Sequence, residues 1–419
     1  MQYYLVEGGK PLHGSIPISG AKNSVLPILA ATLLTGGRTI LHNCPDLRDV
    51  RSALEILEHL GCRTRRQGSD ILVDSSGASR WDVPHALMRE MRSSVIFLGP
   101  ILARFGKARL SLPGGCEIGQ RPIDLHLAAL RRLGAEIREE GGDILCRAGD
   151  LRGREIILSF PSVGATENAM LTACACSGVT RIINAAREPE IADLQAFLQK
   201  AGADIGGSGE SVITVSGGMP RRDVEHTILP DRIETATYLC AAAACGGEVT
   251  LTETQPEQVG TVLQCLSEAG CTVRTAGRSI TLLAPERLGH IAQVRTMPYP
   301  GFPTDAQAPL MAAACTGQGA SVFLETIFEN RYRHVSELAR MGADLRVSGR
   351  TALVNGAALH GASVRCTDLR GGAALVIAAL AARGESRIED ITHIDRGYEH
   401  LAEKLTALGG SIRRLEEPD

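Results

Sequence analysis

The sequence predicts a protein of the mixed α/β (α+β) class, built from six repeated units of about 70 residues that form two domains of three units each. Three observations lead to this prediction. A glycine that ends a helix recurs at nearly even spacing. An alanine-rich apolar stretch recurs with the same period. The first residues also resemble the strands that close a repeat, and the last repeat lacks those strands.

The first landmark is an apolar-periodic helix that ends at a glycine and runs into a strand. Successive glycines are 73, 68, 68, 72 and 67 residues apart, at Gly61, Gly134, Gly202, Gly270, Gly342 and Gly409. A glycine in this place is the usual left-handed residue that terminates a helix.

The second landmark is an alanine-rich apolar stretch that also ends at a glycine. These stretches span residues 24–36, 93–106, 166–178, 234–246, 306–317 and 372–384, and their glycines are 70, 72, 68, 71 and 67 residues apart. Because such helices are apolar on nearly all sides, they belong inside a domain. The second helix of a unit, such as 125–133 with Arg131 and Arg132, has a polar face. Each unit is therefore expected to run helix, strand, helix, strand, hairpin strand, strand, with the first helices buried and the sheets outside.

The order of the elements at the two ends predicts the domain boundaries. Residues 3–7 and 14–19 resemble the last strands of a unit, and the chain ends at the strand 411–415 that precedes such a pair. We expect residues 1–20 to pair with the C-terminal strand. One domain would then be discontinuous, with residues 1–20 and 230–419, and the other would span residues 21–229 and carry the loop around Cys116.

Composition excludes several classes of protein. Hydrophobic residues are 44% and charged residues 22%, which are globular values, and the net charge of −3 leaves no basic surplus for nucleic acid or an anionic membrane. The longest apolar run, residues 373–382, is about half a bilayer span, and the first residues do not form a signal peptide. We expect a soluble, cytoplasmic protein.

The twelve cysteines are scattered and contain no C-x-x-C pair, which favours reduced thiols over disulfides or zinc. The spacing of the histidines, cysteines and acidic residues supports no metal site. Neither of the two common phosphate-binding glycine motifs is present, so no nucleotide loop is expected.

Charged residues stand where the predicted buried helices begin. Asp231 and Asp368 there fit plain helix caps, and that interpretation stays open for each cluster. Cations at these positions oppose the positive end of the helix dipole, and four of them occur: Lys22, Arg92, Arg232 and Arg370. A bound anion would remove the conflict.

The loops after the following strands carry a second set of charged residues. This set comprises Arg48, Arg121, Glu190, Arg331 and Arg396. The helix starts and strand ends of a domain are expected to lie on one face. If the two domains oppose these faces, the cations of both sets line a cleft, which predicts a small polyanionic substrate.

Two further residues are candidates for chemistry. Cys116 lies in a glycine- and proline-rich loop, where Arg121 would favour its reactive thiolate. Asp305 either caps a helix or, facing cations, acts as a general base. His126 and His393 fit packing or hydrogen bonding better than ligation.

Several motifs together are similar to the enolpyruvyl transferase family, in particular to the members that act on UDP-N-acetylglucosamine. They lie at residues 19–24, 113–126, 161–166, 303–305 and 328–331, and the similarity runs from end to end. The resemblance implies an inside-out α/β barrel of two pseudo-three-fold domains with the active site in the cleft between them. It implies transfer of the enolpyruvyl group of phosphoenolpyruvate to the 3-hydroxyl of UDP-N-acetylglucosamine, through a tetrahedral intermediate, with release of phosphate. This reaction is the first committed step of peptidoglycan synthesis. The resemblance implies no cofactor, metal or protein partner.

The resemblance also implies roles for individual residues. The catalytic residues would be Lys22, Cys116, Asp305 and Arg396. Phosphoenolpyruvate would be bound by Lys22, Asn23, Arg92, Cys116, Arg121, Arg370 and Arg396. The sugar nucleotide would be bound by Asn23, Arg92, Arg121, Pro122, Ile123, Asp124, Leu125, Ser162, Val163, Gly164, Asp305 and Ile327. Supporting residues would be Arg48, Glu190, Asp231, Arg232, Arg331 and Asp368. Cys116 would act as a general acid or carry the covalent phosphothioketal.

Two departures from the family pattern and two alternatives remain. Phe160 stands where some members carry a lysine near the uridine, and Arg48 stands where lysine is frequent. The first alternative is the sister enzyme that uses shikimate 3-phosphate, against which the cysteine loop argues. The second is a non-catalytic repeat scaffold, which does not explain cations at matched positions.

Overall fold

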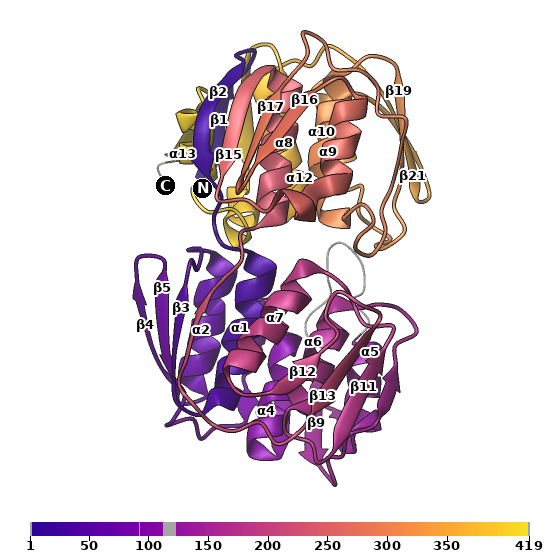
Figure 1. Cartoon of the computed structure of the whole chain (residues 1–419). Helices are drawn as coiled ribbons and strands as arrows, with labels where there is room; N and C mark the ends of the chain where they lie inside the picture. The colour runs from indigo at the N-terminus through magenta and orange to yellow at the C-terminus, as the bar shows by residue number, and fades with distance from the viewer. Residues whose placement is uncertain (1, 92, 112–122, 418–419) are drawn as a thin grey trace. The chain divides into compact units, whose positions relative to one another are not determined.

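The computed structural model describes residues 2–91, 93–111 and 123–417. These residues form two compact units. Unit one contains residues 2–19 and 230–417, and unit two contains residues 20–91, 93–111 and 123–229 (Figure 1). Cys116, Arg92, Arg121 and Pro122 lie outside the described residues.

Unit two holds three sheets and the helices α1 (Lys22–Thr35), α2 (Arg48–His59), α3 (His85–Glu90), η1 (Ser94–Phe97), α4 (Leu98–Phe105), α5 (Asp124–Arg132), α6 (Val163–Ala173) and α7 (Pro189–Lys200). Its strands are β3 (Arg38–His42), β4 (Arg63–Gln67), β5 (Asp70–Asp74), β6 (Asp82–Val83), β7 (Lys107–Ser111), β8 (Ala135–Glu140), β9 (Asp143–Ala148), β10 (Glu155–Ile157), β11 (Val179–Ile183), β12 (Asp204–Gly206), β13 (Val212–Ser216) and β14 (Val224–Thr227).

Unit one repeats this plan with the helices α8 (Arg232–Cys245), η2 (Pro256–Val259), α9 (Gly260–Glu268), α10 (Thr304–Thr316), α11 (Val335–Arg340), α12 (Leu369–Ala381), η3 (Ile391–Arg396) and α13 (Leu401–Ala407). Its strands are β1 (Gln2–Glu7), β2 (Leu12–Pro17), β15 (Gly247–Thr252), β16 (Thr272–Ala276), β17 (Ser279–Leu283), β18 (Gln293–Arg295), β19 (Ala320–Leu324), β20 (Asp344–Ser348), β21 (Thr351–Asn355), β22 (Ser363–Arg365), β23 (Glu385–Glu389) and β24 (Ser411–Glu416).

All six described sheets share one strand pattern. The orders are β14-β3-β5-β4, β6-β7-β9-β8 and β10-β11-β13-β12 in unit two, and β2-β15-β17-β16, β18-β19-β21-β20 and β22-β23-β1-β24 in unit one. The first pair in each order is parallel and the other two pairs are antiparallel. In four sheets the parallel strand comes from the preceding repeat, and in the sheets of β3 and β15 it comes from the last repeat of the same unit, so the three repeats of each unit are tied in a ring. The predicted six-repeat α/β architecture is confirmed.

The N-terminal strands follow this rule, and they correct one prediction. β1 pairs with β24, with Tyr3 opposite Leu415, as expected for the N-terminal segment. β2 does not join the C-terminal strand. It runs parallel to β15, with Leu12 opposite Gly247. In each unit the last strand of the third repeat pairs with a strand of the first repeat. Because β2 is the last strand of the sixth repeat, it completes the sheet of the fourth repeat.

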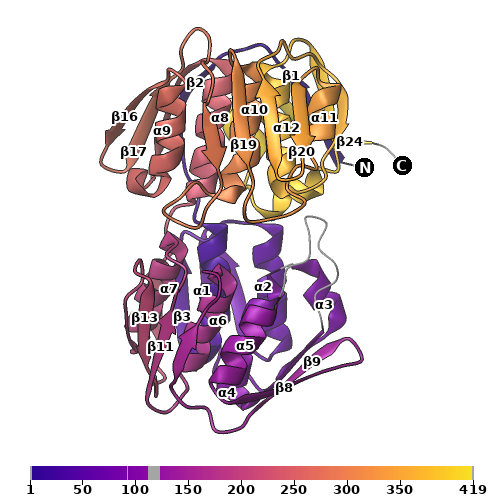
Figure 2. The ribbon, with the colours of Figure 1, turned by 90° about the vertical axis from the view of Figure 1, so that its right-hand side faces the viewer.

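The alanine-rich helices form the core of each unit. Helices α8, α10 and α12 pack against one another in unit one, as do α1, α4 and α6 in unit two (Figure 2). Their side chains are buried almost throughout, for example Leu29 at 0% and Leu310 at 0% exposure. Burying one such leucine contributes about 1.5–3 kcal/mol. Small alanines let the three helices approach closely, which explains how a chain with 3% aromatics builds two cores.

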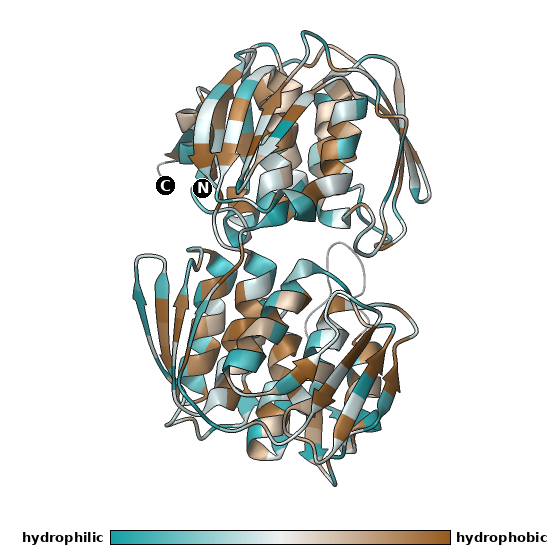
Figure 3. Cartoon of the chain, in the orientation of Figure 1, coloured by the Kyte–Doolittle hydropathy of each residue, from teal (hydrophilic) through white to brown (hydrophobic). Residues whose placement is uncertain are grey.

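The second helix of a repeat lies where two sheets meet. Helix α11 contacts β20 and β22, α13 contacts β24 and β2, and α5 contacts β8 and β10. The polar face expected for these helices is present in α5, where Arg131 and Arg132 are exposed and reach Glu139 of β8 and Glu155 of β10. Figure 3, coloured by hydropathy, shows apolar residues in the helical core and hydrophilic residues in the outer strand β4.

The six helix-ending glycines have the predicted left-handed backbone. Their φ angles are 98°, 104°, 95°, 95°, 88° and 88° at Gly61, Gly134, Gly202, Gly270, Gly342 and Gly409. A side chain is strained in this conformation, so the sequence signal has a direct physical cause. Among the described residues, no helix combines the length and the apolar character that crossing a membrane requires.

Candidate active site

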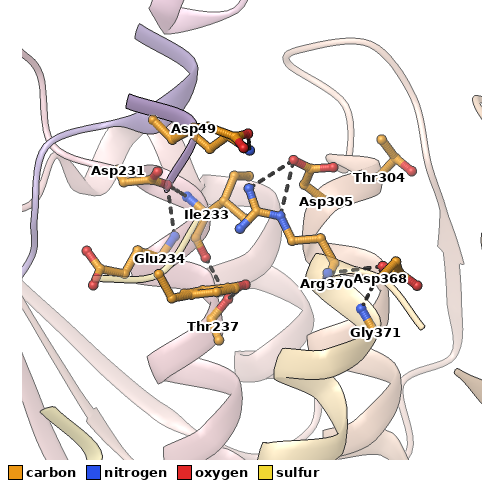
Figure 4. A network of polar contacts seen from close by, with 12 residues as sticks. Asp49, Asp231, Ile233, Glu234, Thr237, Thr304, Asp305, Asp368, Arg370 and Gly371 are labelled. Atoms are coloured by element: carbon orange, nitrogen blue, oxygen red, sulfur yellow. Dashed lines mark hydrogen bonds and ion pairs between the residues drawn. The ribbon is translucent and has the colours of Figure 1, made fainter. Parts of the chain in front are cut away.

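In unit one, the predicted site residues gather where the three buried helices begin. Asp231 is the N-cap of α8 and accepts hydrogen bonds from the backbone N–H groups of Ile233 (2.7 Å) and Glu234 (2.9 Å). Asp368 caps α12 in the same way, with Arg370 N at 3.0 Å and Gly371 N at 2.9 Å. The capping interpretation is therefore correct for these two aspartates (Figure 4).

Asp305 is not a cap. It is the second residue of α10, whose N-cap Pro303 makes no side-chain hydrogen bond. Its Oδ1 accepts from Arg331 Nη2 at 2.7 Å, and its Oδ2 accepts from Arg370 Nη2 at 3.1 Å and Nε at 3.3 Å. We call this group the two-arginine cluster. The two guanidiniums fix the direction of the Asp305 carboxylate.

The two-arginine cluster is largely removed from solvent. Side-chain exposure is 4% for Arg331, 3% for Arg370 and 28% for Asp305. Burial alone lowers the pKa of Arg370, but Tyr398 and Asp305 raise it above its usual range. Two cations share one carboxylate, so the cluster carries one net positive charge at a partly open position. Such a charge in low dielectric attracts an anion strongly.

A buried glutamate holds the loop that supplies this cluster. Glu325 is 1% exposed, and its Oε1 accepts from the backbone N–H groups of Ile327 (2.8 Å) and Phe328 (3.0 Å). Its Oε2 accepts from Thr304 Oγ1 at 2.9 Å, next to Asp305. The sequence analysis did not single out Glu325. The available signal was a lone carboxylate at the end of a buried strand.

His334 is a second residue that the sequence analysis missed. It is fully buried, and its ring lies near the charged groups of Asp368 and Arg331. Burial lowers the pKa of His334 well below its usual range, so the ring is neutral at pH 7. A neutral ring adds no further cation beside Arg331.

Arg232 and Arg396 are two other predicted residues of unit one. Arg232 is buried, with its guanidinium 5.6 Å from the ring centre of Tyr299. Arg396 is the last residue of η3, which packs on α12, and it is half-buried. The next residue, Gly397, lies so close to α12 that a Cβ would be 2.6 Å from Leu369 Cδ2. Arg396 is therefore adjacent to the start of the helix that carries Arg370.

In unit two, Lys22 begins helix α1 and makes a buried ion pair. Its Nζ lies 2.6 Å from Oδ2 of Asp49, and side-chain exposure is 11% for Lys22 and 1% for Asp49. Asp49 stands in the first turn of α2. The sequence analysis named Arg48 instead, but Arg48 is exposed and pairs with Glu90 at 2.7 Å. Asn23, the next residue of α1, is half-buried.

Besides Asn23 in α1, the described sugar-nucleotide residues predicted in unit two lie at two helix starts. Ile123 is the N-cap of α5 and precedes Asp124 and Leu125, while Ser162 is the N-cap of α6 and precedes Val163 and Gly164. Ser162 Oγ accepts from Ala165 N at 3.4 Å.

His126 joins these two helix starts. Its Nδ1 is 2.8 Å from Asn168 Nδ2 of α6. A Cβ on Gly164 would lie 2.7 Å from the His126 ring. This confirms a hydrogen-bonding role for His126 and explains the glycine.

Three buried carboxyl groups lie near the start of α7. Glu188, Glu190 and Glu167 are 8%, 2% and 6% exposed. Burial raises the pKa of Glu167 well above its usual range, and the nearby carboxylates of Glu190 and Glu188 raise it further. Across the described ranges, no three or more His, Cys, Asp or Glu side chains are grouped so as to hold a metal ion.

The eleven described cysteines are all free thiols with poor reactivity. Each is buried or half-buried. Burial raises the pKa of the half-buried Cys265 to about 11 and that of the buried Cys176 to about 11. Thiols with such values are protonated at pH 7 and are weak nucleophiles.

Comparison with known proteins gives one consistent group. The family described as EPSP synthase (3-phosphoshikimate 1-carboxyvinyltransferase) matches residues 6–405. The chain is 52% identical over 419 residues to UDP-N-acetylglucosamine 1-carboxyvinyltransferase 1 of Symbiobacterium thermophilum, covering 98% of this chain and 95% of the relative. It is 48% identical over 416 residues to UDP-N-acetylglucosamine 1-carboxyvinyltransferase 2 of Caldanaerobacter subterraneus subsp. tengcongensis, covering 99% and 100%.

Solved structures resemble the chain over its full length. The enolpyruvyl transferase NikO from Streptomyces tendae has a TM-score of 0.90 at 26% identity, covering 100% of this chain and 99% of that one. EPSP synthase from Acinetobacter baumannii has a TM-score of 0.72 at 18% identity, covering 99% and 100%, and shares the fold.

Proposed function

The chain belongs to the EPSP synthase family of carboxyvinyltransferases, and on this premise we propose that it transfers the enolpyruvyl group of phosphoenolpyruvate to the 3-hydroxyl of UDP-N-acetylglucosamine. The observation that supports this acceptor is the 48–52% identity, over nearly the whole chain, to relatives named for it. The product enters peptidoglycan synthesis. The proposed location is the cytoplasm, and the phosphorylated substrates, which do not cross membranes unaided, support it.

Charge supports the donor. Phosphoenolpyruvate carries a phosphate and a carboxylate, and both need cations held in fixed positions. The partly open two-arginine cluster supplies one net positive charge, and Arg396 precedes Gly397, which lies against the start of the helix that carries Arg370. Lys22 is the corresponding cation of unit two, oriented by Asp49. These groups stabilise the charge that develops on the phosphate as it leaves.

The reaction is an addition followed by an elimination. The sugar 3-hydroxyl oxygen forms a bond to C2 of phosphoenolpyruvate while C3 gains a proton, which gives a tetrahedral intermediate. Loss of phosphate from C2 and of a proton from C3 then restores the double bond. Asp305 accepts the hydroxyl proton, because a carboxylate can act as a general base and the two guanidiniums hold this one at a partly open position. Cys116 is the proposed acid for C3 or the site of the phosphothioketal.

The remaining predicted residues complete the proposal. The proposed sugar-nucleotide contacts are the helix starts at Ile123–Leu125 and Ser162–Gly164, with Asn23 and Ile327. The backbone N–H groups of the two helix starts suit diphosphate oxygens. Phe160 is 41% exposed and supplies an apolar surface where some members place a lysine.

The test is phosphate release from phosphoenolpyruvate with two acceptors. UDP-N-acetylglucosamine should support release and shikimate 3-phosphate should not. The shikimate ester is the second candidate because the family description names that activity. The reverse preference would establish it, and release with neither acceptor would refute both.

A further inference from the structure

Helix α1 begins without a cap of its own. Its N-cap, Ala21, makes no side-chain hydrogen bond, although a polar cap is the usual way to satisfy the first N–H groups. The first turn, which carries Lys22 and Asn23, is held by contacts from elsewhere in unit two. Ala21 N donates to Leu229 O at 2.7 Å, and Ser24 Oγ donates to Oδ2 of Asp193.

Asp193 connects this turn to two other segments. Its Oδ2 also accepts from Leu229 N at 3.3 Å, and its Oδ1 lies 2.9 Å from His226 Nε2. Side-chain exposure is 9% for Asp193 and 4% for His226. A carboxylate this buried is tolerated because three donors surround it. His226 must carry its proton on Nε2 to donate, and its ring packs edge-on against Phe197 at 5.7 Å.

Lys22 is therefore fixed from two directions. Its Nζ pairs with Asp49 at 2.6 Å, while the backbone turn that carries it is tied through Ser24 to Asp193. We propose that Asp193 is a positioning residue that sets where the Lys22 ammonium lies. The proposal rests on the proposed function, in which Lys22 contacts phosphoenolpyruvate.

The effect on catalysis should exceed the effect on stability. Losing one hydrogen bond to a charged group is a modest part of the stability of a unit with a large apolar core. Misplacing a catalytic cation by ~1 Å costs up to about a hundredfold in rate. A merely structural bond would not show this difference.

The experiment compares Ser24→Ala with a matched control in the same helix. Thr35→Val removes a buried hydroxyl at the other end of α1, where it donates to Thr32 O at 2.9 Å. Two readouts are used on the full chain. One is kcat/KM for phosphoenolpyruvate in the phosphate-release assay. The other is the rate of reductive methylation of Lys22 relative to the exposed Lys200, mapped by mass spectrometry.

We expect Ser24→Ala to lower kcat/KM at least about tenfold and to raise relative Lys22 methylation several-fold. Thr35→Val should change neither. In an Asp193→Asn background, the additional effect of Ser24→Ala should disappear, because the two residues act as one unit. If Asp193→Asn fails to fold, the single Ser24→Ala variant still decides.

Two results would overturn the proposal. One is a Ser24→Ala variant that matches Thr35→Val in both readouts. The other is a Ser24→Ala effect that persists in full in the Asp193→Asn background. If the wild-type chain released no phosphate with any acceptor, the proposed function would fail, while the methylation of Lys22 would still test the positioning.

Discussion

Replacing Asp305 by asparagine should separate the structural and catalytic work of the two-arginine cluster. The side chain keeps its shape but loses its charge. Arg331 and Arg370, which are 4% and 3% exposed, then face each other without a carboxylate. Breaking a buried ion pair from one side costs about 3–5 kcal/mol. Because Asp305 is 28% exposed and asparagine keeps one acceptor oxygen, we expect about 2–3 kcal/mol.

The same variant should bind anions better while it turns over more slowly. Two uncompensated guanidiniums attract phosphate more strongly than the cluster does with its carboxylate. The thermal midpoint of Asp305→Asn should fall by roughly 5–10 °C without ligand. Added phosphate should raise it by more than it raises the wild-type value. Without its base, kcat should fall by more than about a hundredfold.

Differential scanning fluorimetry with and without phosphate, together with the phosphate-release assay, measures these effects. Asp143→Asn is the control, because Asp143 is 19% exposed and bonds Arg109, whose side chain is 55% exposed. An exposed arginine finds water instead, so the control should lose at most about 1 kcal/mol and keep its turnover. An Asp305→Asn variant that is no less stable than the control, and no more responsive to phosphate, would refute the charge argument.

Three further predictions follow from the site. Lys22→Ala and Arg396→Ala should each lower kcat more than about a hundredfold, whereas Arg132→Ala should leave it unchanged; equal effects in all three variants would contradict the assignment. Cys116 should be the one thiol labelled by an anionic phosphonate epoxide, faster with sugar nucleotide and slower with phosphoenolpyruvate, as peptide mapping would show; labelling mainly elsewhere would remove it from the site. Glu167→Gln should stabilise unit two at pH 7–8 and less at pH 5, measured by urea unfolding. The pKa of Glu167 is higher in the folded than in the unfolded chain, so its contribution to the free energy of unfolding is full below the unfolded pKa and is lost as the pH rises through the folded pKa. A Glu167→Gln variant whose added stability did not change with pH would contradict this.

Much of the fold could be predicted because its signals are local. A helix that ends needs a left-handed residue, and glycine adopts that backbone without strain, so Gly61 and its five equivalents mark the period directly. An all-apolar helix such as α12 must be buried wherever it lies. The exchange of strands between repeats left no local mark. The sequence analysis therefore placed β2 beside the C-terminal strand, whereas it lies parallel to β15.

For the site too, some features could be predicted from the sequence and others could not. The sequence by itself determined which residue types stand at helix starts, and cations at those positions already indicated an anion. Only the tertiary structure decided which of them are caps and which form a cluster: Asp368 caps its helix, while Asp305 bonds arginines 26 and 65 residues away. Asp49, Asp193 and Glu325 gave no distinct signal, because a buried carboxylate is defined by the donors around it. Those donors come from segments that only folding brings together.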